Sequence, residues 1–256
     1  MMKIYSPKAT VELIHLVLLD LLGRKVDKKQ YALKGGCNLR FFFKSIRYSD
    51  DMDLDVSSAL PKDKLQVVMN RIIESKSLSQ ILDVKGIKIL ESSSPKQTET
   101  TQRWKFSLTS PQSSIPLRTK IEFSRRGIKP DLAFDSVDAN LIREYEVTPI
   151  LASHYNRIEA CAQKVIALAT RRQIQARDVF DLYFLLAAGI DPEVLYEKTA
   201  NYIDKARENV WEVSYDVFMS QVVSNLELEY QAQYSSPELW DSMVLKVVTA
   251  LGKFNK

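Results

Sequence analysis

The sequence has few cysteines and glycines and lacks a long apolar run. Its 256 residues include two cysteines, Cys37 and Cys161, without C-x-x-C spacing. This argues against a disulfide framework and a thiolate zinc site, and it predicts a reduced, cytoplasmic setting. Only seven glycines and nine prolines occur, unlike collagen-like, linker-rich or disordered chains. The apolar stretch 11–20 contains Glu12 and Asp20 and is too short and polar to span a bilayer, so no membrane partner is expected.

The remaining composition is that of an ordinary globular protein. Apolar residues make up 45% and charged residues 27% of the chain, which is enough for a buried core. A length of 256 residues fits one large domain or two lobes, at about 150 residues per domain. The formal net charge of +4 is compatible with a phosphate-rich partner but does not require one.

The spacing of apolar residues changes near residue 150 and predicts two lobes. In the first lobe, helices are expected at 10–23 and 62–78, strands at 51–56, 84–90, 103–108 and 117–123, and a hairpin-like loop at 91–102. In the second lobe, only helices are expected, at 158–170, 178–188, 192–205, 215–226 and 236–253. The predicted fold class is therefore α+β, with a mixed sheet and flanking helices in residues 1–150 and a helical lobe in residues 151–256.

Two adjacent glycines, Gly35 and Gly36, precede a stretch in which acids alternate with apolar residues, 51–56. Successive strand side chains point to opposite faces, so Asp51 and Asp53 would lie on the face away from the core. Neighbouring carboxylates raise one another's pKa unless a cation intervenes, and Mg²⁺ takes carboxylate oxygens together with substrate phosphates. A glycine turn would complete such a site, because its backbone N–H groups can approach phosphate oxygens closely.

A third carboxylate is expected from Glu122, which alternates with apolar neighbours in the last strand predicted for the first lobe. Two metal ions held by carboxylates activate an attacking hydroxyl and stabilise a departing pyrophosphate. The pattern therefore favours metal-assisted nucleotidyl transfer, with Asp51, Asp53 and Glu122 as metal ligands. Asp50 and Asp55 are assigned to solvent or a turn.

Four short motifs carry a family resemblance. They are Gly35-Gly36…Leu39-Arg40…Arg47-x-Ser49-x-Asp51-Met52-Asp53-Leu54, then Lys120-Ile121-Glu122, then Lys164-Val165-Ile166-Ala167-Leu168-Ala169-Thr170-Arg171, and finally Arg177-Asp178-Val179-Phe180-Asp181-Leu182-Tyr183. In this order they resemble the motifs of the AbiEii/AbiGii nucleotidyltransferase toxins, a branch of the polymerase-β-like nucleotidyltransferase superfamily. The resemblance implies that residues 1–150 form the nucleotidyltransferase lobe. It also makes Lys164 and Asp181 candidate functional residues.

The later motifs also have a physical interpretation of their own. Lys164 and Arg171 are seven residues apart, nearly two helical turns, so both project from one helix face and could neutralise triphosphate charge. A solvated basic face is the alternative. Asp178 and Asp181 share a face as well, and they could orient Lys164 or Arg171, contact the nucleotide or favour a helix N-terminus.

The sequence thus predicts an enzyme that moves an NMP from an NTP to an acceptor hydroxyl. Gly35, Gly36 and Ser49 would hold phosphate, Asp51, Asp53 and Glu122 would bind Mg²⁺ or Mn²⁺, and Asp53 or Glu122 would help to deprotonate the acceptor. The resemblance implies a toxin of a toxin–antitoxin or phage-defence system, with a cognate antitoxin and an RNA acceptor, the tRNA 3′ end above all. In some relatives phosphorylation of the serine matching Ser49 switches activity off, which we take as a hypothesis here.

Two alternatives remain open at this stage. The first keeps the enzyme but changes the acceptor to a protein side chain or a small molecule such as an aminoglycoside. The second is a non-catalytic nucleotide-binding or antitoxin-binding module, against which the intact Asp51 and Asp53 pair argues.

Overall fold

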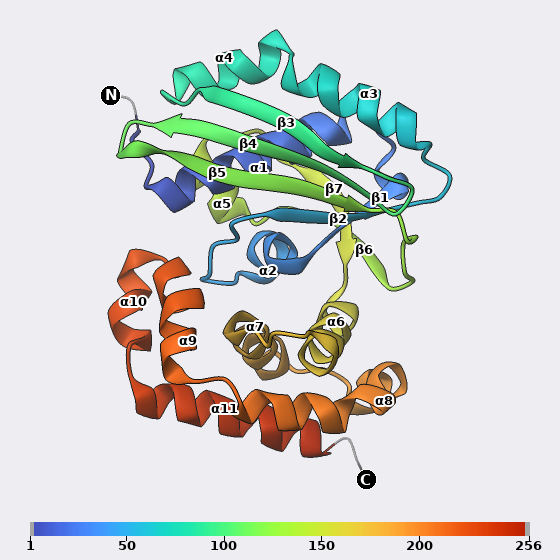
Figure 1. Ribbon diagram of the computed structural model, residues 1–256, viewed down its shortest axis with the longest axis vertical. Helices are drawn as coiled ribbons and strands as arrows, with labels where there is room; N and C mark the ends of the chain where they lie inside the picture. Colours follow the sequence, from blue (N-terminus) through green and yellow to red (C-terminus); the bar gives the residue numbers. More distant parts are fainter. Residues whose placement is uncertain (1–2, 254–256) are drawn as a thin grey trace. The chain divides into compact units, whose positions relative to one another are not determined.

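A computed structural model describes residues 3–253 of the chain (Figure 1). The chain divides into two compact units. Unit 1 runs through Lys44 and resumes at Tyr48–Tyr155, whereas unit 2 comprises Ser45–Arg47 and the chain from Asn156 onward. Residues 151–155, placed after the lobe boundary in the sequence prediction, are a strand of the unit 1 sheet, and a three-residue segment of unit 2 lies within the unit 1 sequence.

Unit 1 is built around one mixed sheet, as the sequence predicts. Its strands are β1 (Tyr31–Lys34), β2 (Met52–Val56), β3 (Ile89–Gln97), β4 (Thr101–Ser110), β5 (Ser113–Ser124), β6 (Leu132–Ser136) and β7 (Leu151–Tyr155). In the described chain they follow the order β3-β4-β5-β2-β1-β7-β6. The pairs β2–β5 and β1–β7 are parallel, and the other neighbours are antiparallel. Strand β2, which carries the acid-rich motif, therefore lies near the middle of the sheet.

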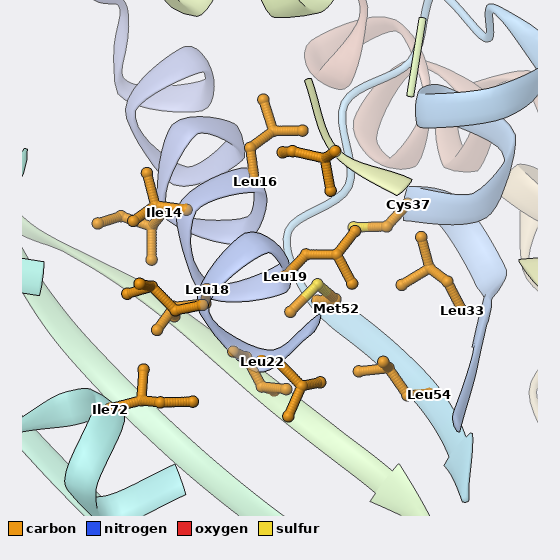
Figure 2. Packing of buried hydrophobic residues seen from close by; sticks show 14 of the residues in the cluster. Ile14, Leu16, Leu18, Leu19, Leu22, Leu33, Cys37, Met52, Leu54 and Ile72 are labelled. Atoms are coloured by element: carbon orange, nitrogen blue, oxygen red, sulfur yellow. The ribbon is translucent and has the colours of Figure 1, made fainter. Parts of the chain in front are cut away.

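Helices cover this sheet and bury its apolar side chains. They are α1 (Pro7–Gly23), α2 (Gly35–Phe43), α3 (Lys62–Ile73), α4 (Lys76–Val84) and α5 (Ala139–Tyr145), with a 3₁₀ turn, η1, at Lys28–Gln30. Helix α1 begins after Ser6, whose hydroxyl accepts a hydrogen bond from the Ala9 amide. Figure 2 shows Leu19 of α1 packed with Met52 and Leu54, which are fully buried as their alternation predicts. This core fixes which face of β2 carries the acids.

Three local predictions in unit 1 are wrong. The helix expected at 62–78 is two helices, because Ser75 caps a second helix through its hydroxyl and the Leu78 amide. The strand expected at 84–90 begins only at Ile89, since Val84 ends α4, and most of the predicted loop 91–102 is strand. Strands β3 and β6, the latter absent from the prediction, lie at the two edges of the sheet and are mostly exposed, so neither shows the apolar alternation that marks a half-buried strand.

Unit 2 is helical, as predicted. Its helices are α6 (Arg157–Thr170), α7 (Ala176–Ala187), α8 (Pro192–Trp211), α9 (Tyr215–Gln221), α10 (Leu228–Tyr234) and α11 (Pro237–Gly252), with a 3₁₀ turn, η2, at Val223–Asn225. The predicted starts of α8 and α11 are confirmed, because Asp191 and Ser236 cap helices that begin with proline. The helix expected at 215–226 ends at Gln221, and α10 was not predicted. Within residues 3–253, none of the helices is both long and apolar enough to cross a membrane.

Candidate active site

The three acids predicted to act together lie on adjacent parts of the unit 1 sheet. Strands β2 and β5 run parallel, and Asp53 is paired in register with Glu122. Asp51 immediately precedes β2, beside the position of Lys120 on β5. This register confirms that Glu122 comes from the strand next to the Asp-x-Asp motif. The alternation of apolar and acidic residues, which buries Met52 and Ile121, leaves the acids on the other face.

Asp53 lies against the start of α2. A Cβ placed on Gly35 would lie 3.4 Å from Asp53 Oδ2, and Gly35 has a φ of +66°, in the left-handed region that favours glycine. Burial raises the pKa of Asp53, while Lys34 and Lys120 oppose the rise and the charges of Asp51 and Glu122 add to it. Burial is therefore the main cause of the raised pKa of Asp53, and the two neighbouring acids reinforce it.

Gly35 and Gly36 form the first turn of a helix, where the sequence predicted only a turn. Helix α2 begins at Gly35, and the side chain of the preceding residue, Lys34, makes no capping hydrogen bond to its N-terminal amides. The N-terminus of a helix favours anions because its first N–H groups lack intrahelical partners. Ser49, the other predicted phosphate contact, donates its hydroxyl hydrogen to the Asp51 carbonyl over 2.8 Å. The phosphate-binding roles of these residues stay predictions.

Cations of the sheet neutralise two of the three acids. Lys120 Nζ lies 2.8 Å from Asp51 Oδ2, and Arg103 Nη2 lies 2.5 Å from Glu122 Oε2. In residues 3–253, no group of three or more His, Cys, Asp or Glu side chains is arranged to hold one metal ion. The donors nevertheless fit a hard divalent cation, because they are carboxylates whose mutual repulsion Lys120 and Arg103 relieve here.

Asp55 differs from its prediction. It was assigned to solvent or a turn, but it is buried, with Lys34 Nζ 2.5 Å from its Oδ1. The Tyr155 hydroxyl donates to its Oδ2 over 2.7 Å. Lys34 belongs to β1 and Tyr155 to β7, so these partners could not be predicted from the sequence of β2 alone. Asp55 therefore stabilises the sheet beside the acids.

A hollow of about 370 Å³ extends from Asp51 over the neighbouring strands. Its lining includes the cations Lys105, Arg118 and Lys120. Lys105 and Lys120 are direct cross-strand partners, an arrangement of like charges that is unfavourable unless an anion is near. The hollow is thus lined by two carboxylates, Asp51 and Glu91, and by these three cations.

The later motifs form a buried charge network in unit 2. Lys164 Nζ lies 2.9 Å from Asp178 Oδ1 and 2.7 Å from Asp181 Oδ2, so both acids orient Lys164. Arg171 Nε lies 3.0 Å from Asp178 Oδ2, although that oxygen has no hydrogen-bond donor of good geometry among the described residues. Burial alone would lower the pKa of Lys164, but Asp178 and Asp181 outweigh it and raise the pKa. The shared face of Asp178 and Asp181 on α7 is confirmed, because both contact Lys164. Arg171 does not share a helix face with Lys164 as predicted, since α6 ends at Thr170 and Arg171 has extended backbone. The catalytic roles of these residues stay predictions.

Arg47 is the member of this network for which the sequence assigned no role. Its Nη2 and Nε lie 2.8 Å and 3.0 Å from the two oxygens of Asp181. Burial would raise the pKa of Asp181, but Arg47 and Lys164 outweigh it and hold the pKa at about 2. In the sequence, the only indication that Arg47 has a role is its position in the first motif, two residues before Ser49. Its partner is 134 residues away in sequence, so the pairing required the fold.

The arrangement in unit 1, an Asp-x-Asp strand beside a glutamate strand and an open helix N-terminus, is typical of nucleotidyltransferases. Comparison with protein families identifies the group more closely. The model of the family described as "Nucleotidyl transferase AbiEii toxin, Type IV TA system" matches residues 17–251. The chain therefore belongs to the AbiEii family of nucleotidyltransferase toxins and is an enzyme of the nucleotidyltransferase class.

Solved structures support the fold. The chain is similar to JHP933 from Helicobacter pylori, with a TM-score of 0.60 and 15% identity over 98% of this chain and 93% of that one. It is also similar to a "putative nucleotidyltransferase" from H. pylori, with a TM-score of 0.59 and 16% identity over 95% of this chain and 92% of that one. At 15% and 16% identity, these two similarities show a shared fold alone. Among curated proteins, none matches the sequence.

Proposed function

We propose that this protein transfers an NMP from an NTP to a hydroxyl of an RNA acceptor, with release of pyrophosphate. The tRNA 3′ end is the proposed acceptor, and growth inhibition relieved by a cognate antitoxin is the proposed role. The observation that carries the proposal is the register of β2 and β5, in which Asp53 lies beside Glu122 and Asp51 lies two residues before Asp53. Type IV toxin–antitoxin membership agrees with this role.

Each residue of the site has a proposed task. Asp51, Asp53 and Glu122 would hold Mg²⁺ or Mn²⁺, which when bound supplies positive charge to the phosphates and lowers the pKa of the attacking hydroxyl. The N-terminal amides of α2, at Gly35 and Gly36, would donate hydrogen bonds to the triphosphate, with Ser49 beside them. Asp53 or Glu122 would accept the proton of the acceptor hydroxyl.

The cations of the network and the hollow have distinct proposed tasks. In unit 2, Asp178 and Asp181 orient Lys164, while the more exposed Arg171 is the better candidate for neutralising phosphate charge. In unit 1, Lys105 and Arg118 have no ion-pair partner among the described residues and are exposed in the hollow next to Asp51. Such cations suit the phosphates of a polyanionic acceptor better than a neutral small molecule.

A label-transfer assay tests the proposal. The wild-type protein is incubated with each of the four α-³²P-labelled NTPs, MgCl₂ and total RNA, tRNA, cell protein or an aminoglycoside. We expect label on tRNA. We also expect Asp53→Asn and Glu122→Gln to lower the rate at least about 100-fold, since metal-bound carboxylates contribute several kcal/mol to such transition states.

Matched variants control for folding. Asp83→Asn and Glu74→Gln remove one exposed carboxylate each from the region of α4 and should leave the rate within about twofold. Label on protein or on the aminoglycoside instead of RNA would reassign the acceptor. No transfer to any acceptor, together with NTP binding that is independent of MgCl₂, would identify a non-catalytic module.

A further inference from the structure

A second cationic hollow lies in unit 1, away from the predicted catalytic acids. It has a volume of about 640 Å³ and lies where the connection from α1 to β1 meets the edge strand β6 and its neighbour β7. Its lining includes four cations within six residues: Arg24, Lys25, Lys28 and Lys29. None of the family-like motifs includes any of these residues.

The cations of this hollow are unequally compensated. Arg24 is paired with Asp20, and Lys28 donates a hydrogen bond to the Gly23 carbonyl. Lys25 and Lys29 are exposed, and neither has an ion-pair partner among the described residues. Asp27 also lines the hollow, and its carboxylate accepts a hydrogen bond from the Lys29 backbone N–H. The hollow therefore presents the two ammonium groups of Lys25 and Lys29 to solvent, with one carboxylate beside them.

An exposed aromatic ring faces the same hollow. Phe134 on β6 is 56% exposed and lines the hollow together with Ser153, its register partner on β7. A ring beside a group of cations is the combination by which proteins bind single-stranded nucleic acid, with bases stacking on the ring and phosphates contacting the cations.

A buried hydroxyl lies next to Gly23, at the rim of the hollow. Tyr31 is almost completely buried, and its hydroxyl has no hydrogen bond among the described residues. A Cβ on Gly23, which lines the hollow, would lie 3.0 Å from that oxygen. Gly23 therefore lies against both the hollow and this hydroxyl, a kind of buried polar group that is normally hydrogen-bonded.

We propose that this hollow binds a single-stranded segment of RNA, with Lys25 and Lys29 on its phosphates and Phe134 stacked on a base. Strand β1 connects the hollow to the acids, since Tyr31 lies at one end and Lys34, the register partner of Asp53, at the other. The separation along the strand is about 10 Å. The hollow would hold part of the acceptor away from its reacting end, and in this respect the inference rests on the proposed function.

Binding is measured without catalysis by fluorescence anisotropy of a labelled single-stranded RNA 12-mer, in the absence of NTP. We expect Lys25→Glu/Lys29→Glu to weaken binding roughly tenfold or more and to reduce the slope of log K against log salt by about 1.4, the value for two phosphate contacts on a single strand. Phe134→Ala should weaken binding about 5-fold to 100-fold through lost stacking, with the salt slope unchanged.

Two control variants make the test specific. Lys64→Glu/Lys76→Glu changes net charge equally on exposed positions of α3 and α4, and Ile115→Ala removes another exposed apolar side chain. Both should bind within twofold of wild type. Equal losses in the two charge-reversal variants would mean diffuse attraction and overturn the proposal, as would wild-type binding that none of the hollow variants weakens, or no binding at all.

The outcomes also separate this inference from the proposed function. RNA binding through the hollow without any label transfer to RNA would contradict only the proposed function. Efficient tRNA labelling that is unchanged in Lys25→Glu/Lys29→Glu at subsaturating tRNA would contradict only the role of the hollow.

Discussion

His15 is a buried histidine beneath the acid-rich strand. The Thr119 hydroxyl donates to the Asp50 carbonyl over 2.7 Å, so it accepts a hydrogen bond from His15 Nε2, also 2.7 Å away. Nδ1 then faces Cys37 Sγ at 3.5 Å. Burial lowers the pKa of His15 to about 4, although Asp51 and Asp50 oppose this. A buried histidine held in this way has a structural role and is not a catalytic base.

His15 should make stability fall as the pH is lowered. Between pH 6.5 and about 4 the unfolded chain binds a proton at this histidine and the folded chain does not, so unfolding is favoured progressively, by up to about 3 kcal/mol. We expect His15→Gln to show a shallower loss of unfolding free energy across this range, measured by urea denaturation at a series of pH values. The same measurement on His154→Asn gives the contribution of the other histidine to this pH dependence. Equal slopes in wild type and His15→Gln would contradict the assignment.

At the scale of elements, the contact between α6, α7 and the segment Ser45–Arg47 is an ion network in which Arg47, Lys164, Asp178 and Asp181 are buried. Asp181 binds both Arg47 and Lys164, and its removal takes one carboxylate away from two buried cations. Removing one partner of a buried ion pair typically costs 3–5 kcal/mol because the remaining charge is uncompensated. The motif that resembles a catalytic one therefore has a structural task as well.

We expect Asp181→Asn to lower the free energy of unfolding of the protein by about 3–5 kcal/mol. The matched variant Asp204→Asn, at an exposed position of α8, should change it by less than about 0.5 kcal/mol. Urea denaturation followed by far-ultraviolet circular dichroism measures both. If Asp181→Asn were as stable as Asp204→Asn, the network would not stabilise unit 2.

At the scale of the whole molecule, the chain passes between the units three times, because Ser45–Arg47 belongs to unit 2 although the residues on both sides of it belong to unit 1. The connection between α2 and β2 is thus held by the buried Arg47–Asp181 pair. Unfolding of unit 2 would release this connection, immediately before Ser49 and Asp51. We therefore expect the two units to unfold together.

The three tryptophans allow this to be measured, since Trp104 lies in unit 1 and Trp211 and Trp240 lie in unit 2. We expect the fluorescence transition to coincide with the far-ultraviolet circular dichroism transition in both Trp104→Phe and Trp211→Phe/Trp240→Phe. Comparing the two signals within one variant cancels the destabilisation that each substitution causes. Separate midpoints for the two signals would mean that the units unfold independently.

Several features were predictable from sequence because they depend on local periodicity. The alternation in 51–56 predicts the buried side of β2, and the cap-plus-proline pairs predict the starts of α8 and α11. The edge strands β3 and β6 were missed because exposure on both faces removes the pattern on which such predictions depend. The four motifs were enough to recognise the family, since their order and spacing survive without any coordinates.

Pairings between distant residues had to come from the fold. Asp55 looked like its neighbours in sequence, and it is buried because β1 and β7 bring Lys34 and Tyr155 to it. The Arg47–Asp181 pair and the hollow of Lys25, Lys29 and Phe134 likewise join segments more than 100 residues apart. The sequence by itself determined the types of element and the residues able to do chemistry, because both follow from near neighbours. Only the tertiary structure decided which charges meet, because burial and compensation depend on segments that the chain brings together in space.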